Sequence, residues 1–266
     1  MPYDERRQPT MTFNPGTPIE NPALRGISLR IEAGEFVTVI GTNGAGKSTF
    51  LNAVAGTIRV DSGKITLNNI DVTKKSAHQR AHWVARVFQD PMAGTCEALT
   101  IEENMALAYK RGESRFLKGA LNHKNREIFR EKLAILKLGL ENRLTDRMGL
   151  LSGGQRQAVS LLMASLQPSK ILLLDEHTAA LDPKTAAFVL ELTDKIVQEN
   201  NLTTMMVTHS MQQALNHGTR TVMLHQGQVV LDVSGDERKG MTVHDLLNMF
   251  ERTRGEVVED DSLILS

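Results

Sequence analysis

The chain has 266 residues, and its 31 Lys and Arg residues balance its 31 Asp and Glu residues, so the formal net charge is +0. Because such a chain has no global field to attract polyanions, we expect no nucleic-acid partner. Hydrophobic residues make up 41% of the sequence, which excludes a disordered chain. Cys96 is the single cysteine, which excludes an internal disulfide and favours a reducing compartment.

The first predicted elements are two strands. Residues 1–10 carry charges of both signs and no apolar core, so we predict no secretory signal there. Residues 27–31 alternate apolar and polar side chains, as a half-buried strand does, and residues 36–40 have the pattern of a buried strand. Residues 2–12 lack such alternation, which argues against a strand there. We find no stretch of the roughly 20 apolar residues that a membrane helix needs.

A phosphate-binding motif follows the strand expected at residues 36–40. The string GTNGAGKST fits G-x-x-x-x-G-K-[ST] between a strand and a helix, a context that disfavours a chance glycine-rich turn. Glycines let successive N–H groups point at phosphate oxygens, and the following helix adds its positive dipole end. We expect the ammonium of Lys47 to neutralise the β- and γ-phosphates and the hydroxyl of Ser48 to bind Mg²⁺. The nucleotide-binding candidates are Gly41, Thr42, Asn43, Gly44, Ala45, Gly46, Lys47, Ser48 and Thr49.

The middle of the chain predicts a helical insertion. Strand patterns at residues 65–67 and 84–88 precede it, and between about residues 91 and 168 the strand pattern disappears. Helix-period segments take its place at residues 101–110, 127–140 and 153–166. Phe129, Leu133, Leu136 and Leu140 have 4, 3, 4 spacing, which indicates the core-facing stripe of one helix.

A second candidate phosphate site lies at the end of the insertion. The string LSGGQRQ at residues 151–157 opens a helix whose first turn Ser152 can cap. The N–H groups of that turn and its positive dipole end suit an anion. The alternative is that Ser152 is an ordinary N-cap with no ligand. Because a long insertion separates residues 151–157 from the phosphate-binding motif, we favour a turn that completes a site on a second copy of the chain.

An acidic strand end follows. Residues 171–174 form an apolar strand that leads into Asp175 and Glu176. Beside a phosphate loop, Asp175 can hold Mg²⁺ through water, and Glu176 can polarise an attacking water as general base. Such a string is often structural when it stands alone, but the upstream motif favours the functional interpretation.

The rest of the chain predicts a helix at residues 184–197, strands at residues 203–207 and 221–224, and a hairpin turn at Gln226 and Gly227. Asp182 precedes Pro183 and can cap the helix. We expect one domain over residues 1–250 and a loose acidic tail over residues 251–266.

These motifs resemble the ATP-binding subunit of a bacterial ABC transporter over about residues 13–250. Residues 41–49 are similar to its Walker A motif, residues 151–155 to its LSGGQ signature and residues 171–175 to its Walker B motif. The resemblance implies a catalytic role for Glu176, Gln89 and His209, metal contacts from Ser48, Gln89 and Asp175, and a D-loop at Asp182. It further implies that Ser152, Gly153, Gly154 and Gln155 act on nucleotide held by the other copy, and that the ring of Phe13 stacks on adenine.

The implied fold is an α/β P-loop NTPase core with a mainly parallel sheet, an antiparallel β subdomain and an inserted helical subdomain at about residues 91–168. The implied activity is ATP hydrolysis with Mg²⁺ as cofactor. The implied partners are a second copy of the chain, integral membrane permease subunits and a substrate-binding protein. The implied location is the cytoplasmic face of the cell membrane, where the chain is held peripherally by the permease.

Transport direction and substrate are less constrained. Residues 89–91, 177–182 and 207–210 resemble uptake systems, in particular a subgroup for aromatic amino acids such as tryptophan and tyrosine. His177 departs from the Pro that many relatives carry after the catalytic glutamate. An export subunit and a non-transport ABC ATPase remain alternatives, although residues 49–151 contain no sustained heptads of the kind that a chromosome or repair ATPase would need.

Overall fold

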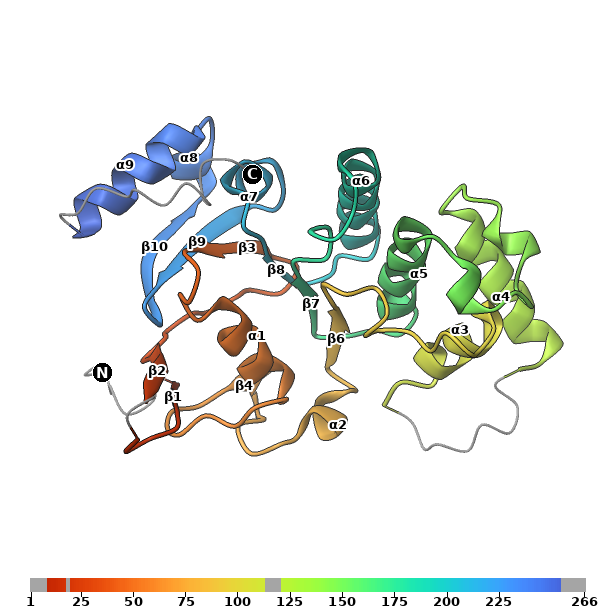
Figure 1. Cartoon of the computed structure of the whole chain (residues 1–266), viewed down its shortest axis with the longest axis horizontal. Coiled ribbons are helices and arrows are strands. Elements are labelled where there is room, and N and C mark those ends of the chain that lie inside the picture. Colours follow the sequence, from red (N-terminus) through yellow and green to blue (C-terminus); the bar gives the residue numbers. More distant parts are fainter. Residues whose placement is uncertain (1–8, 18–19, 113–120, 255–266) are drawn as a thin grey trace. The chain divides into compact units, whose positions relative to one another are not determined.

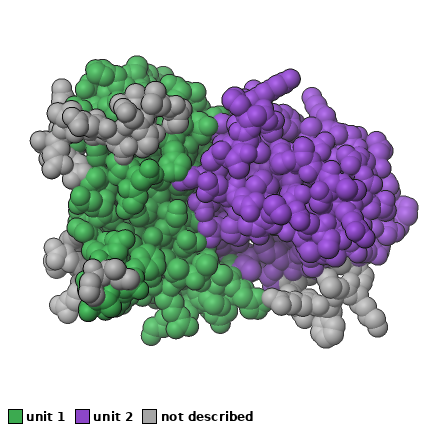
Figure 2. All heavy atoms as spheres, in the orientation of Figure 1, with its two compact units in different colours: residues 1–80, 203–266 green, residues 81–202 purple. Residues whose placement is uncertain are grey.

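The computed structural model describes residues 9–17, 20–112 and 121–254, so the expectations for residues 1–8 and for the end of the acidic tail lie outside the described residues. The chain forms two compact units, coloured separately in Figure 2. The first combines residues 1–80 with residues 203–266, and the second contains residues 81–202. Both units contain predicted site residues.

The first unit is built around β3 (Phe36–Gly41), whose six residues are all buried. This strand lies between β8 (Thr204–Val207) and β9 (Arg220–His225) and runs parallel to both. β10 (Gln228–Ser234) closes the β9 hairpin in the antiparallel direction. A strand that is apolar on both faces is typical of a parallel sheet covered by helices, and the predicted mainly parallel core is confirmed.

Helices of the first unit pack against these strands (Figure 1). They are α1 (Lys47–Ala55), α7 (Met211–Asn216), α8 (Gly235–Arg238) and α9 (Val243–Arg254). The short helix α2 (Ala77–Arg80) contacts α1 instead, because Arg80 donates to the backbone oxygens of Ala53 and Val54. In α9, Leu246 and Phe250 are four residues apart and share a buried cluster with Ile40 of β3. The C-terminal helix is therefore part of the core of this unit.

Two small antiparallel pairs complete the first unit, and two predictions about its strands are wrong. β1 (Thr10–Phe13) pairs with β2 (Asn21–Arg25), and β4 (Thr66–Leu67) pairs with β5 (Ile70–Asp71). The strand predicted at residues 27–31 is wrong, because that segment is irregular although Ile27 is buried and Arg30 exposed. The expected lack of a strand in residues 2–12 is also wrong at its end. Alternation sets which side chains are buried, whereas a strand also needs a backbone partner.

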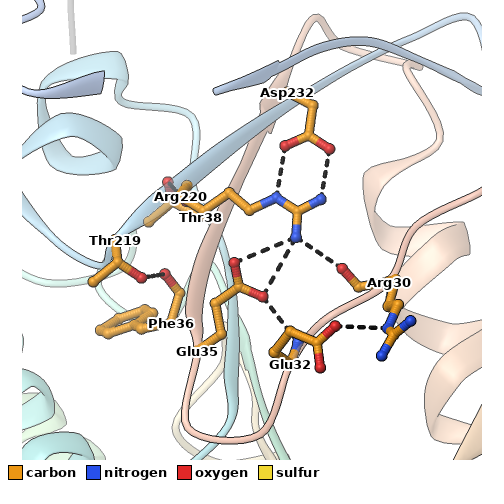
Figure 3. Close-up of polar contacts among 8 residues, drawn as sticks. All are labelled: Arg30, Glu32, Glu35, Phe36, Thr38, Thr219, Arg220 and Asp232. Carbon is orange, nitrogen blue, oxygen red and sulfur yellow. Dashed lines mark hydrogen bonds and ion pairs between the residues drawn. The ribbon is translucent and has the colours of Figure 1, made fainter. Parts of the chain in front are cut away.

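A charged cluster joins the strands of the first unit (Figure 3). Arg220 on β9 donates to both carboxylate oxygens of Asp232 on β10 at 2.6 Å, to Glu35 at 3.3 Å and to the backbone oxygen of Arg30 at 2.8 Å. The hydrogen bonds to Asp232 raise the pKa of Arg220 above its usual range. A bidentate pair of this kind is geometrically specific. The contacts of the same guanidinium with Glu35 and the Arg30 oxygen hold the segment that leads into β3.

The second unit contains two parallel strands and a helical insertion between them. β6 (Val84–Val87) pairs with β7 (Ile171–Asp175). The insertion and the helix after β7 comprise α3 (Ile101–Tyr109), α4 (His123–Ala134), η2 (Leu140–Asn142), η3 (Met148–Leu150), α5 (Gly153–Ser165) and α6 (Pro183–Glu199). The inserted helical region is confirmed. Among the described residues, no helix combines the length and apolar character that a bilayer crossing requires.

One predicted helix has different bounds. The helix expected at residues 127–140 begins earlier, because Asn122 accepts a hydrogen bond from the N–H of Asn125 and caps α4. It ends at Ala134, before the positive φ angles of Lys137 and Gly139 at 55° and 71°. The apolar stripe of that segment is nevertheless buried, so the predicted core face is correct although the helix is shorter.

Candidate active site

The phosphate loop of the first unit runs from the end of β3 into α1, and close backbone contacts require two of its glycines. A Cβ atom on Gly41 would lie 2.1 Å from the backbone oxygen of Leu224, and one on Gly46 would lie 2.5 Å from that of Ala23. Both residues have positive φ angles, 152° and 95°. A side chain at either position would therefore both clash and strain the backbone.

Lys47 is held within this loop. Its side chain is buried, and its ammonium donates to the backbone oxygens of Gly41 at 2.7 Å and Thr42 at 3.2 Å. The Thr42 hydroxyl lies 3.3 Å from Nδ1 of His225, and the N–H of Gly227 donates to the oxygen of Ala45 at 3.0 Å. The end of the β9–β10 hairpin thus supports the loop, a contact that sequence reasoning missed.

The start of α1 has no side-chain cap, unlike the starts of several other helices. Gly46 caps it without a side-chain hydrogen bond, and its first turn contains no acidic residue. Side chains cap α3, α4, α5, α6 and α7. Ser48 is exposed in the first turn of α1. The positive end of this helix dipole, together with Lys47, therefore suits a phosphate group.

In the second unit, the acidic pair lies at the end of β7. Arg86 of β6 donates to Oδ2 of Asp175 at 2.6 Å, and each side chain is 14% exposed. Glu176 is buried and has a φ angle of 46°. A left-handed backbone is costly for a residue other than glycine and is concentrated at functional sites, which supports a functional role for this turn.

His177 anchors the turn after Glu176. It is 2% exposed, and its Nε2 lies 2.9 Å from the Thr193 hydroxyl on α6, which donates to the backbone oxygen of Val189 at 2.8 Å. Many relatives carry a rigid Pro at this position. In this chain a buried hydrogen bond from His177 takes its place.

The second unit brings the signature turn and the D-loop together. Ser152 and Gln155 form a reciprocal capping box at the start of α5. A Cβ atom on Gly154 would lie 2.0 Å from Cγ2 of Thr185 in the first turn of α6. Asp182 caps that helix by accepting from the N–H of Thr185 at 3.1 Å, and the side-chain hydrogen bond of Thr185 lowers the pKa of Asp182.

The remaining predicted residues divide between the units. Phe13 ends β1 and is 38% exposed, and His209 is partly buried just before Ser210, the N-cap of α7; both belong to the first unit. Gln89 is exposed just after β6 in the second unit. The backbone oxygen of the preceding Phe88 accepts from the side chain of Gln157 on α5 at 3.0 Å.

Sequence reasoning also missed Arg86 and Gln157. Arg86 could have been found, because a charged residue in the apolar strand VARVF needs a partner when it is buried. Gln157 offered no comparable signal, since a single amide in a helix is usually solvated.

The donors present fit Mg²⁺ delivered with a nucleotide. Within the described part of the chain, no cluster of three or more His, Cys, Asp or Glu could hold a metal ion by itself. Mg²⁺ in phosphate sites needs one or two protein oxygens, because phosphate oxygens and water complete its shell. Ser48 and Asp175 provide oxygens of this kind, one in each unit.

The β3–loop–α1 geometry and the acidic end of β7 define a P-loop nucleotide-binding protein. A profile of the ABC transporter family matches residues 24–179. The chain is 49% identical to the tyrosine transport ATP-binding protein of Clostridioides difficile (strain R20291), over 87% of this chain and 92% of that protein. It is 35% identical to the thiamine import ATP-binding protein ThiQ of Shigella sonnei (strain Ss046), over 79% and 85% of the two chains.

A solved structure agrees with these matches. The post-hydrolysis dimer of the ATP-binding cassette MJ0796, bound to ADP and Pi, superposes with a TM-score of 0.72 at 30% identity, over 86% of this chain and 97% of that one. The chain therefore belongs to the ABC transporter family, as an ATP-binding subunit with ATPase activity. The family resemblance and the fold class drawn from the motifs are confirmed.

Proposed function

We propose that this chain hydrolyses ATP with Mg²⁺ to power the uptake of an aromatic amino acid, such as tyrosine or tryptophan, through a separate membrane permease. The observation that carries the ATPase part is the loop of residues 41–49, whose glycines are required by backbone contacts and whose Lys47 lies within it. The substrate class is supported by the 49% identity to a tyrosine transport ATP-binding protein.

Each site residue has a chemical role in this proposal. Lys47 and the N–H groups of the loop and the first turn of α1 bind the β- and γ-phosphates, and the Phe13 ring stacks on adenine. Ser48, Asp175 and Gln89 hold Mg²⁺, which when bound offsets phosphate charge. Glu176 accepts the proton of the attacking water while the water oxygen bonds to the γ-phosphorus and ADP leaves, and His209 orients the reacting groups.

The nucleotide is enclosed by a second copy of the chain. Ser152 and Gly153 are exposed, so their helix start is accessible to a nucleotide held elsewhere. The similar cassette MJ0796 forms a dimer in its complex with ADP and Pi, which supports this arrangement. The dimer would close on ATP and reopen after hydrolysis, and the permease would change conformation in response to these two states.

The permease docks near residues 89–104, and the chain works at the cytoplasmic face of the membrane with a substrate-binding protein outside. The import names of relatives such as the thiamine protein support this direction over export.

Uptake of labelled amino acid tests the proposal in cells whose own copy of the gene is deleted. The wild-type chain should restore uptake of labelled tyrosine or tryptophan, and Glu176→Gln at equal expression should not, because water would lack its base. Restored uptake with Glu176→Gln would contradict the catalytic assignment. If labelled phosphonate or thiamine accumulates instead, the ATPase role stands and the substrate class is wrong.

A further inference from the structure

Arg86 is a cation in the interior of an apolar strand, and it contacts the acidic residue to which the proposed function gives the metal. Its neighbours Ala85 and Val87 are fully buried. Its guanidinium NH2 lies 2.6 Å from Oδ2 of Asp175, and both side chains are 14% exposed. A charge pair so far out of water interacts strongly and is costly to separate.

The backbone register explains why these two groups meet. β6 and β7 run parallel, with Arg86 opposite Leu173 and Val87 opposite Leu174. Asp175 is therefore one step beyond the last paired residue, where a long side chain from β6 can still reach it. The contact follows from the strand pairing itself and not from a loop conformation.

The guanidinium is also held from a second side. Cζ of Arg86 lies 4.6 Å from the centroid of the Phe88 ring, a cation–π distance. Residues two apart on a strand share a face, and the backbone oxygen of Phe88 is fixed by Gln157 at 3.0 Å. Arg86 is thus oriented toward one oxygen of Asp175.

We propose that Arg86 is a positioning residue that serves as the resident counter-ion of Asp175. It keeps this carboxylate oriented and lowers its affinity for a free divalent cation, so that the metal enters with the nucleotide and not alone. The inference rests on the proposed function, in which Asp175 holds Mg²⁺. Arg86 and the metal share one carboxylate, so the positive charge of Arg86 opposes the metal.

The expected effect follows from this competition. Loss of one positive charge beside the carboxylate should strengthen cation binding, and for partly screened groups near a surface a change of about tenfold is reasonable. Arg86→Gln keeps hydrogen-bonding capacity but removes the charge, and Arg86→Lys keeps the charge. A purely structural Arg86 would affect stability but would not make metal affinity depend on charge at position 86.

Binding of Mn²⁺ to the full-length chain tests the inference, with electron paramagnetic resonance as the readout and without hydrolysis. Each variant is titrated with Mn²⁺ alone and with Mn²⁺ in the presence of saturating AMP-PNP. Arg86→Gln should bind Mn²⁺ alone about tenfold more tightly than wild type, and Arg86→Lys should stay within about twofold of wild type. With AMP-PNP present the change in Arg86→Gln should be smaller, because phosphate oxygens supply most of the metal ligands. Unchanged Mn²⁺ affinity in Arg86→Gln would overturn the inference.

Controls separate this inference from general effects. Arg126 of the same unit is paired with Glu102 at 2.7 Å, so Arg126→Gln removes a paired arginine elsewhere and should leave Mn²⁺ binding unchanged. If Arg86→Gln does not fold, Phe88→Leu removes only the ring beside the guanidinium and should tighten Mn²⁺ binding about threefold. No tightening in Phe88→Leu would then overturn the inference.

Asp175→Asn separates the inference from the proposed function. If this variant binds Mn²⁺ with AMP-PNP as tightly as wild type does, Asp175 does not hold the metal and that part of the proposed function fails. If Asp175→Asn weakens Mn²⁺ binding while Arg86→Gln leaves it unchanged, the proposed function stands and the role of Arg86 is wrong.

Discussion

Lys47 is a buried cation, and its surroundings are carbonyl oxygens of its own loop. The oxygens of Gly41 and Thr42 accept from its ammonium at 2.7 and 3.2 Å, which orients the side chain along the loop. Charged hydrogen bonds of this kind are among the stronger ones in proteins. The arrangement holds the ammonium in place before a phosphate arrives, so little ordering remains to be done on binding.

Lys47→Ala should therefore weaken ATP binding by at least tenfold, because the phosphate loses a charged partner worth about 1.5–3 kcal/mol. Titration calorimetry with AMP-PNP measures this directly. Lys64→Ala is the matched control, since Lys64 is half exposed and pairs with Asp71 at 3.8 Å on the surface of the same unit. Equal affinity in Lys47→Ala and wild type would contradict the assignment of the phosphate loop.

At the scale of elements, the start of α5 is packed closely against the start of α6. The signature turn uses Gly154 where a side chain would lie 2.0 Å from Thr185. Thr185 is β-branched and lies in the first turn of a helix that Asp182 caps, so it has little freedom to move aside. The two helix starts are consequently one packed feature of the second unit.

Gly154→Ala should lower the free energy of unfolding by about 1–3 kcal/mol, the usual cost of overpacking. Thermal or urea unfolding of the full chain measures the loss. Gly153→Ala is the neighbouring control, because its Cβ would lie 3.7 Å from Leu181, an ordinary contact. A Gly154→Ala variant as stable as Gly153→Ala would show that this packing is looser than described.

How far the sequence predicts these elements depends on how local the cause is. The strand–loop–helix at residues 36–55, the strand that ends at Asp175 and the cap by Ser152 are set by adjacent residues, and the structure has each of them where it was predicted. The strand expected at residues 27–31 does not form, because a strand needs a neighbouring strand to bond with. In this part of the chain, β2 (residues 21–25) pairs with β1 instead. Arg86 was missed for a related reason, since its contact with Asp175 exists only once β6 and β7 pair.

For the whole molecule, zero net charge conceals local positive sites. Lys47 and the start of α1 belong to the first unit, and the start of α5 belongs to the second. A polyanionic nucleotide needs positive potential only where its phosphates bind. In the proposed cycle each copy provides one phosphate loop and one signature turn, so the active form is a pair of chains.

In the proposed mechanism, Glu176 activates water in an ATP-bound dimer of this chain. Glu176→Gln is mixed with Mg-ATP, and molar mass by light scattering is recorded together with phosphate release. We expect a stable dimer that retains ATP and releases phosphate at least a hundredfold more slowly than wild type, since general-base catalysis contributes about 10²–10⁴-fold. Phosphate release at the wild-type rate, or a monomer with bound ATP, would contradict this mechanism.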